Sequence, residues 1–539
     1  MPAALGAAVL GFAALAVRLA WRGPFTVDEF QYAHASWLVA RGALPYRDFF
    51  EVHLPLVYQW LAPWWLLLGD DPAAIVWLRV ALLPFLALTA LAAAIINRRD
   101  GAVSSALAPV LLFACPPFIS FATQIRPDPV AFALLLGALG VQSLRRPGPL
   151  ARGAVSGALL VLSVWASQKV LFYGAPLLLC LVPGAGGRRA RGFIAGALAA
   201  LLPIAAYLTL THSWGAIWHW CFAWAAEHQR GYPGFSYRRY FDGAFAASGW
   251  LFALAALGIT ATARRWAASG AERSSDPDLV LLLCVPTAFG SFAMQRAPYP
   301  YSLVPLLGLV AVFAARGAAA VLRLLQPLRL GPVGGVALAA LLSMQALRLF
   351  SGETNEAQRK VLERIGQLTA PGDTAYDNSG SYVARPHAYF YFYTDAFLRT
   401  SQADTLAREV PLVLVERECV LRVEDVRSDT LPPSLALFLA QHYQPLDGDL
   451  SFWGQRYDHS GEGNFLAVKS GRYFVEPEAA LEGLEIDGVP LPGPVFSLSA
   501  GNHPVRSAGS APFYLLWLPR DARRWTPQPG RAPALSQLF

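Results

Sequence analysis

Residues 75–99 read IVWLRVALLPFLALTALAAAIINRR, a long apolar run that ends in two arginines. A helix that crosses a bilayer needs roughly 20 mostly apolar residues, so this run predicts a membrane-spanning helix. Similar runs recur at 3–20, 103–121, 129–144, 153–168, 170–184, 192–211, 246–263, 279–294, 301–316 and 331–350. The first run has no basic start, so we interpret it as a helix and not as a signal peptide. The pattern predicts a polytopic α-helical membrane protein with about 11 transmembrane helices.

The composition of the whole chain agrees with this class. Of its 539 residues, 55% are hydrophobic and only 15% are charged, whereas soluble domains are about 25% charged. The formal net charge of +7 comes largely from arginines in short loops between the apolar runs. Membrane topology explains such arginines, so we expect no nucleic-acid partner.

The arginines alternate between loops and thereby predict the orientation in the membrane. One set of loops holds Arg98 and Arg99; Arg145, Arg146 and Arg152; Arg188, Arg189 and Arg191; Arg264, Arg265 and Arg273; and Arg316, Arg323 and Arg329. The positive-inside rule places these loops in the cytoplasm. An odd number of spans then leaves the C-terminal part, residues 351–539, outside the cytoplasm, which predicts a multi-pass membrane protein.

The sequence pattern changes after the membrane part, residues 1–350. Residues 351–450 alternate helical and apolar patterns, which predicts an outer α/β domain. Helices are expected at 354–369 and 432–443, and a buried strand at 411–415. Residues 451–520 predict a small β-sandwich from five short runs, at 465–468, 472–475, 484–486, 495–498 and 513–518, with a hairpin at Asp487-Gly488. The Arg/Pro-rich tail at 521–539 is expected to be disordered.

The first outer loop opens with Thr26-Val-Asp28-Glu29. Apolar residues three and four apart then predict a helix lying in the membrane interface, and a second interfacial helix is expected near 54–67. Two adjacent acids beside the membrane suit a transferase that acts on a lipid-anchored substrate. The same four residues also form a capping box, which would give the acids a purely structural role.

Further motifs carry a resemblance to a known family. After Asp28-Glu29-x-x-Tyr32 come Gly42-x-x-Pro45-Tyr46 and His53-x-Pro55, with Tyr58 following; later loops hold Arg126-Pro-Asp128 and Gln295-Arg296-x-Pro-Tyr299. Over about residues 10–350 this set resembles the GT-C glycosyltransferases. Within them it is most similar to bacterial relatives of the protein O-mannosyltransferases and the lipid A aminoarabinose transferases.

The resemblance implies a sugar transfer on the outer face of the bacterial inner membrane, with the C-terminal domain in the periplasm. The donor would be a polyprenyl-phosphate sugar, the acceptor a hydroxyl of a glycan, lipid or protein, and the reaction would invert the anomeric carbon. Asp28 would be the general base and Glu29 mainly a cap. No cofactor is implied, and the first loop has no Asp-x-Asp pattern, so we expect no essential metal. The remaining candidate substrate-binding residues are Tyr32, Tyr46, His53, Arg126, Asp128, Lys169, Arg296 and Tyr299.

Each of these residues has a simpler alternative role. Arg126, Lys169 and Arg296 either hold the donor phosphate or only set topology. Asp128 takes part in catalysis, pairs with Arg126 or starts a helix, while His53 contacts substrate or satisfies backbone groups. Asp48 and Glu51 are expected to be solvated. The run 389–393, YFYFY, is either a buried strand or a sugar-stacking platform.

Two other functions compete with the transferase. A transporter or flippase would show paired broken helices in two repeats, and the sequence has no such repeat. A glycan-binding or assembly scaffold would leave the acidic pair without a role.

Overall fold

The computed structural model describes residues 2–181, 187–232, 234–268, 276–325, 331–350, 352–428, 431–458, 460–520, 523–528 and 534–535. Arg273 and Arg329 of the topology pattern therefore lie outside the described residues. The chain forms two compact units that interleave in sequence. The helical unit comprises Met1–Gly23, Glu51–Leu61 and Val76–Thr354, and the sheet unit comprises Pro24–Phe50, Ala62–Ile75 and Asn355–Phe539.

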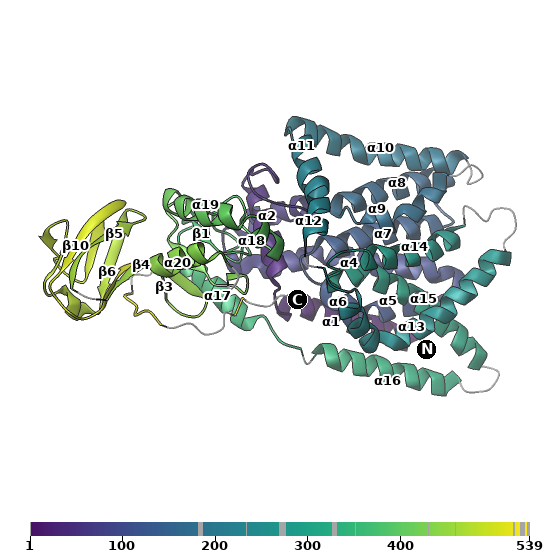
Figure 1. The fold of residues 1–539 in the computed structure, drawn as a ribbon. Coiled ribbons are helices and arrows are strands. Elements are labelled where there is room, and N and C mark those ends of the chain that lie inside the picture. The colour runs from purple at the N-terminus through teal and green to yellow at the C-terminus, as the bar shows by residue number, and fades with distance from the viewer. Residues whose placement is uncertain are drawn as a thin grey trace. The chain divides into compact units, whose positions relative to one another are not determined.

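Helices make up the helical unit, as the apolar runs predict (Figure 1). Their bounds are α1 Pro2–Arg22, α4 Ile75–Asn97, α5 Ala102–Phe113, α6 Pro116–Ala122, α7 Pro127–Ser143, α8 Pro149–Ala166, α9 Val170–Tyr173, α10 Gly187–Leu210, α11 Trp214–Ile217, α12 Ala225–Gly231, α13 Arg238–Ala268, α14 Pro277–Ala293, α15 Val304–Leu325 and α16 Gly331–Phe350. α3, Leu56–Leu68, runs across the boundary of the two units and corresponds to the second predicted loop helix.

Among the described residues, five helices are long and apolar enough to cross a membrane, or seven if two pairs of consecutive helices each form one span. Helices α7 and α14 have 17 residues each, slightly short for a straight span. The predicted number of about 11 spans therefore stays a prediction. The run 170–184 is not one helix: α9 ends at Tyr173 and a 3-10 segment, Ala175–Leu181, follows. Gly174 and Pro176 explain the break, because proline removes a helix hydrogen bond.

Small residues allow the helices of this unit to pack backbone to backbone. A Cβ atom at Gly317 of α15 would lie 1.9 Å from the carbonyl oxygen of Leu254 on α13, and one at Gly258 would lie 2.0 Å from that of Phe313. Such close approach is typical of helices that associate in a bilayer. Arg316, predicted to lie in a loop, is instead buried within α15, where it pairs with Asp278 at 2.9 Å. The apolar run ends there, but the helix continues to Leu325.

The sheet unit contains two sheets. One has the strand order β1-β2-β4-β11-β6-β9 with β3 paired to β4, and the other has the order β5-β10-β7-β8. The strands are β1 Ala375–Tyr376, β2 Leu421–Val423, β3 Tyr443–Pro445, β4 Leu450–Tyr457, β5 Gly461–Ala467, β6 Gly471–Glu476, β7 Leu484–Ile486, β8 Val489–Pro490, β9 Val495–Leu498, β10 Gly501–Ser507 and β11 Phe513–Trp517; the helices after residue 354 are α17 Glu356–Leu368, α18 Ala396–Ser401, α19 Ala403–Glu416 and α20 Pro433–His442. All five predicted strand runs coincide with strands.

A single hydrophobic core joins the sheets to the helices of this unit. Leu414 of α19, Leu439 of α20, Trp453 of β4 and Val505 of β10 belong to one buried cluster. The first half of strand β4 pairs with β2 on one side and with β3 on the other, and its second half pairs with β11. The first sheet therefore continues across residues 450 and 451, where the sequence predicts a domain boundary.

Some predicted details are wrong. Residues 411–415 lie in helix α19 and not in a strand, and Leu406, Val410 and Leu414 form its buried face at helical spacing. In the tail at 521–539, residues 523–528 and 534–535 are described and include packed side chains; the others lie outside the described residues, so the disorder of the tail stays a prediction. Trp525 contacts Phe474, with ring centroids 5.9 Å apart, and Leu535 is buried. The hairpin at Asp487-Gly488 is confirmed, with both residues at positive φ, as its turn requires.

The first-loop segment 24–50 belongs to the sheet unit through specific contacts. Gln358 of α17 binds both backbone groups of Phe25, at 2.7 and 2.8 Å. Helix α2, Val27–Ala40, is the predicted helix, but it is buried on nearly all sides, not along one interfacial stripe. Part of its cover is the aromatic run 389–393, a loop and not a strand, in which Tyr389, Phe392 and Tyr393 are buried and the other two residues half-buried; Phe392 packs on His34.

Candidate functional site

Asp28 and Glu29 lie side by side at the start of α2 but have different partners. The Asp28 carboxylate accepts a hydrogen bond from Arg427 at 3.1 Å, and its side chain is 13% exposed. Glu29 is fully buried and accepts a hydrogen bond from the backbone N–H of Thr26 at 3.1 Å, which is the predicted capping contact. Consecutive helical residues point about 100° apart, so the two acids face different surroundings.

Arg427 is held by a tight loop of the sheet unit. It donates to the carbonyl oxygen of Asn378 at 3.1 Å, in addition to Asp28. The Asp425 carboxylate accepts from the backbone N–H groups of Asn378, Arg427 and Ser428, at 2.8 to 3.1 Å. Arg427 and Asp28 are 399 positions apart in the sequence. This fixed arginine therefore orients the candidate base.

A second carboxylate, Asp377, lies buried in the same region. It accepts hydrogen bonds from the backbone N–H groups of Ser379, Gly380 and Ser381, and from the Ser381 hydroxyl. Burial, and then the charge of Asp425, raise the pKa of Asp377 to about 7. Close packing around this loop leaves little room for a substrate: a Cβ atom at Gly380 would lie 3.0 Å from the Phe392 ring.

Other motif residues of the first loop are buried or form a backbone turn. Tyr46 is buried, has a φ of 71° and donates its N–H to the Phe49 carbonyl oxygen at 2.9 Å. Tyr32 is also buried, on α2. Gly42, with a φ of 85°, ends this helix where the motif places a glycine. The Gly-x-x-Pro-Tyr motif therefore forms a tight turn in the sheet unit.

His53 lies in the helical unit, next to an unexpected buried acid. Its Nδ1 is 2.8 Å from Glu51, whose carboxylate also accepts from the His53 and Val52 backbone N–H groups. Glu51 is fully buried, so its predicted solvation is wrong; the hydrogen bonds offset the cost of burying it. Asp48 is 36% exposed and pairs with Arg47. Gln168 donates to the Val52 carbonyl oxygen at 3.0 Å and so fixes the His53 segment to the Lys169 loop.

Three of the predicted charged residues come together in the helical unit. Lys169, in the tight loop between α8 and α9, donates to Asp128 at 3.0 Å and to Ser302 at 3.2 Å. Asp128, in the first turn of α7, also accepts from the Ser167 hydroxyl at 3.1 Å. Arg126 and Lys169 both lie over the ring of Tyr301, at 4.3 and 4.9 Å from its centroid. Two cations thus converge on one aromatic ring, and the Asp128 carboxylate contacts Lys169.

The late-loop residues adjoin this cluster. Tyr299 stacks on Tyr301, with ring centroids 5.7 Å apart, and its hydroxyl hydrogen-bonds that of Tyr232. Arg296 donates from Nε to the Tyr232 carbonyl oxygen at 3.2 Å. Gln295 accepts from Ser302 at 3.2 Å. The Gln-Arg-x-Pro-Tyr motif therefore supports the cluster from the side of η6, Pro300–Leu303.

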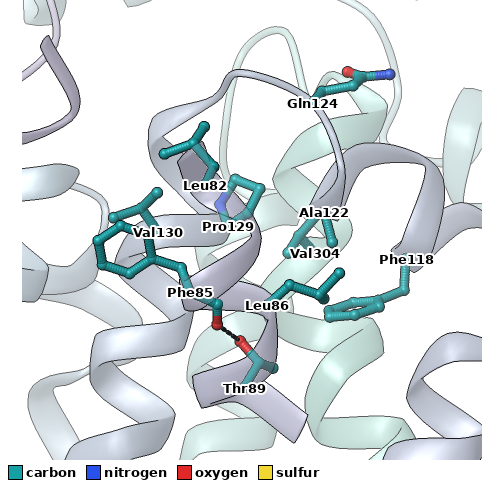
Figure 2. A pocket seen from close by; sticks show the side chains of 10 residues that line it. All are labelled: Leu82, Phe85, Leu86, Thr89, Phe118, Ala122, Gln124, Pro129, Val130 and Val304. Atoms are coloured by element: carbon teal, nitrogen blue, oxygen red, sulfur yellow. Dashed lines mark hydrogen bonds between the residues drawn. The ribbon is translucent and has the colours of Figure 1, made fainter. Parts of the chain in front are cut away.

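A small apolar pocket lies beside Arg126. Residues of α4, α6, α7 and α15 line it, and Gln124 lies at one end of the set (Figure 2). Arg126 donates from Nε to this Gln124 at 2.6 Å. The cavity itself has a volume of about 10 Å³, about the room that one water needs. The pocket therefore places apolar side chains next to the cationic cluster, but it is too small to hold a ligand.

Sequence reasoning missed Arg427, Tyr301 and Ser302. Tyr301 and Ser302 directly follow the Tyr299 motif, so the proline-rich turn 298–300 was their available signal. Arg427 had no local signal, because it stands in an ordinary polar segment. Among the described residues, no group of three or more His, Cys, Asp or Glu side chains is placed to hold a metal ion. The absence of an essential metal stays a prediction.

The chain resembles known proteins in structure and not in sequence. No family model matches the sequence, and no curated protein does. Among solved structures, ArnT from Cupriavidus metallidurans in the apo state matches with a TM-score of 0.58, covering 83% of this chain and 98% of ArnT at 14% identity. The chain has the GT-C fold.

Two further structures agree. The same ArnT bound to undecaprenyl phosphate gives a TM-score of 0.53 at 14% identity, covering 71% of this chain and 84% of that one. The oligosaccharyltransferase of Archaeoglobus fulgidus in the apo form gives 0.51 at 13% identity, covering 82% and 72%. The resemblance that the first-loop motif indicates is thus confirmed for the fold, and the apolar helices support a location in the membrane.

Proposed function

We propose that this protein transfers a sugar from a polyprenyl-phosphate donor to an acceptor hydroxyl on the outer face of the membrane, with inversion and with Asp28 as the general base. The observation that carries the proposal is the pair of cations, Arg126 and Lys169, gathered over Tyr301 in a chain with the GT-C fold. One of the matched ArnT structures holds undecaprenyl phosphate.

The cationic cluster suits a lipid phosphate. Lys169 is 25% exposed and reaches the surface, whereas Arg126 is 1% exposed and is oriented by Gln124. Charges in such partly buried positions beside apolar helices act in a low dielectric, where they stabilise an anion more than they would in water. Asp128 offsets one positive charge and keeps Lys169 in place. The phosphate of the donor would replace part of this pairing.

The reaction balances without a cofactor. The acceptor oxygen attacks the anomeric carbon from the face opposite the phosphate while Asp28 takes the hydroxyl proton. The bond between the anomeric carbon and the phosphate oxygen breaks, and its electron pair leaves with the polyprenyl phosphate. Because the phosphate is already a good leaving group, positive charge near its oxygens is needed more than an acid.

Arg427 gives the base its orientation in this scheme. A carboxylate that points one oxygen at a fixed guanidinium has its plane defined, so the proton transfer starts from a prepared geometry. Arg427 acts through Asp28 and is therefore a positioning residue. Glu29, which caps α2 and is fully buried, would take no part in proton transfer.

Cleavage of the donor is the test of this proposal. The purified full chain would be incubated with polyprenyl-phosphate sugars and cell-envelope acceptors, and released polyprenyl phosphate would be measured by mass spectrometry. We expect release that needs an acceptor and stops in Asp28→Asn. A donor that stays intact with every acceptor, yet crosses vesicle membranes containing the protein, would instead show a transporter.

A further inference from the structure

The sheet unit has a cavity of about 540 Å³ far along the chain from the Asp28 loop. Its lining includes Arg364 and Gln367 of α17 and Arg523, Arg524 and Trp525 of the tail. Pockets that bind small ligands commonly measure about 300–1,000 Å³. The tail is anchored where it forms this wall, because Trp525 packs on Phe474 and Thr526 donates to Glu476 at 2.7 Å.

The cavity is lined by positive charge. Its lining has three arginines and no carboxylate among the described residues. Arg364 pairs with Asp447, and Arg524 pairs with Glu478 at 2.7 Å, so acids outside the lining hold these two guanidinium groups in place. Arg523 is exposed and makes no ion pair among the residues that the structure describes. The guanidinium group of Arg523 could therefore pair with an anionic group of a ligand.

Trp525 adds an aromatic surface and an unused donor. Its indole Nε1 is buried and has no hydrogen-bond partner in the described structure. A buried donor without a partner costs free energy. Tryptophan beside arginine is a combination that suits a sugar ring: the indole covers the apolar face, and the guanidinium groups bind oxygens.

We propose that this cavity binds a sugar that carries a negatively charged group, a phosphate or a carboxylate, as found on acidic glycans. Trp525 contacts the sugar ring, and Arg523 pairs with the anionic group between the two fixed arginines. The site belongs entirely to the sheet unit and contains none of the residues assigned to the transfer reaction. The inference therefore does not depend on the proposed function.

Binding to the purified full chain tests this inference. Isothermal titration calorimetry would compare glucose 6-phosphate and glucuronate with uncharged glucose and with inorganic phosphate. We expect both charged sugars to bind at least about tenfold more tightly than glucose or phosphate alone, since a charge-assisted hydrogen bond is worth about that much. Equal binding of inorganic phosphate would overturn the sugar part, and equal binding of glucose would overturn the anionic part.

Variants separate the cavity from general surface charge. Arg523→Gln, which removes the charge, and Trp525→Ala, which removes the ring, should each weaken charged-sugar binding about tenfold. Arg506→Gln is the matched control, because Arg506 is an exposed arginine of β10, paired with Glu462 at 3.9 Å and outside the cavity. An equal loss in Arg506→Gln, or no loss in Arg523→Gln, would overturn the proposal. Asp28→Asn should bind charged sugars normally, so failure here is distinct from failure of the transfer reaction.

Discussion

At the scale of single residues, the two acids of the first loop show what a sequence can and cannot predict. The spacing Thr26-x-x-Glu29 indicates a cap, and Glu29 makes that contact. The partner of Asp28 could not be predicted, because Arg427 is brought to it only by the tertiary fold. A lone arginine among polar residues has no pattern that distinguishes it.

Arg427 provides the first prediction. Replacing it with Gln should lower kcat about 100-fold with little change in the donor KM, because small misplacement of a catalytic group costs about that much. Arg427→Lys should recover part of the loss, since it restores the charge beside Asp28. Arg422→Gln is the control: Arg422 pairs with Glu424 at 2.7 Å in the same unit. Wild-type kcat in Arg427→Gln would contradict the positioning role.

Two buried histidines predict a pH dependence of stability. Burial, and then Arg417, lower the pKa of His387 to about 4, although a hydrogen bond with the Asp48 backbone opposes this shift; burial, and then His387, lower that of His34. Unfolded histidine has a pKa of about 6.5, so between about pH 6.5 and 4 the unfolded chain binds more protons. Stability is therefore lost as the pH falls through this window, by about 1.4 kcal/mol per pH unit for His387.

Variants make that prediction specific. In thermal unfolding scans, the Tm of His387→Asn should fall less than that of the wild type between pH 6.5 and 4. His503 is a contrast: burial opposes its charge, but its contacts with Asp487 and the Ser499 carbonyl oxygen raise its pKa, so its contribution is lost as the pH rises. A parallel pH profile in wild type and His387→Asn would refute the assignment.

At the scale of elements, periodicity predicted most helices and the five short strands. It failed at 411–415, where a short apolar run reads equally well as strand or helix; the buried positions 406, 410 and 414 identify the helix. Strand β4 was missed because its second half, Gly454 to Tyr457, is polar or small and breaks the apolar pattern. Because β6 and β11 extend the sheet of β4, deleting residues 460–539 would expose the core that these strands share with it.

The loop between α8 and α9 carries a prediction about donor binding. Lys169→Met should weaken binding of a polyprenyl-phosphate sugar about 10- to 100-fold, the value of a charge-assisted contact. The double variant Lys169→Met, Asp128→Asn removes the acid that Lys169 would leave unpaired. If Lys169 holds phosphate, the double variant stays weak. Recovery of wild-type affinity in the double variant would show that Lys169 only neutralises Asp128.

At the scale of the whole molecule, the apolar runs predict a helical membrane part, and the structure has the GT-C fold. The interleaving of the two units could not be predicted. Residues 24–50 are separated from 355–539 in the sequence by most of the membrane part, yet they belong to one compact unit. Contacts such as those of Gln358 with Phe25 join residues that are far apart in the sequence, so no local sequence pattern predicts them.

Topology supplies a prediction at this scale. Because the arginine-rich loops alternate with charge-poor ones, residues 351–539 should lie outside the cytoplasm. A reporter that is active only in the cytoplasm should stay silent when fused after Gly352 and should be active when fused after Arg146. Strong activity after Gly352, with a silent fusion after Arg146, would reverse the orientation.

The most direct test of the central claim compares the two adjacent acids in sugar transfer from a polyprenyl-phosphate donor by purified enzyme. Asp28→Asn keeps the shape of the side chain but cannot take the proton, so turnover should fall about 10²–10⁴-fold, with donor binding little changed. Glu29→Gln can still cap α2, so it should fold and keep much of its activity. Near-full turnover by Asp28→Asn would contradict the account, whatever the behaviour of Glu29→Gln.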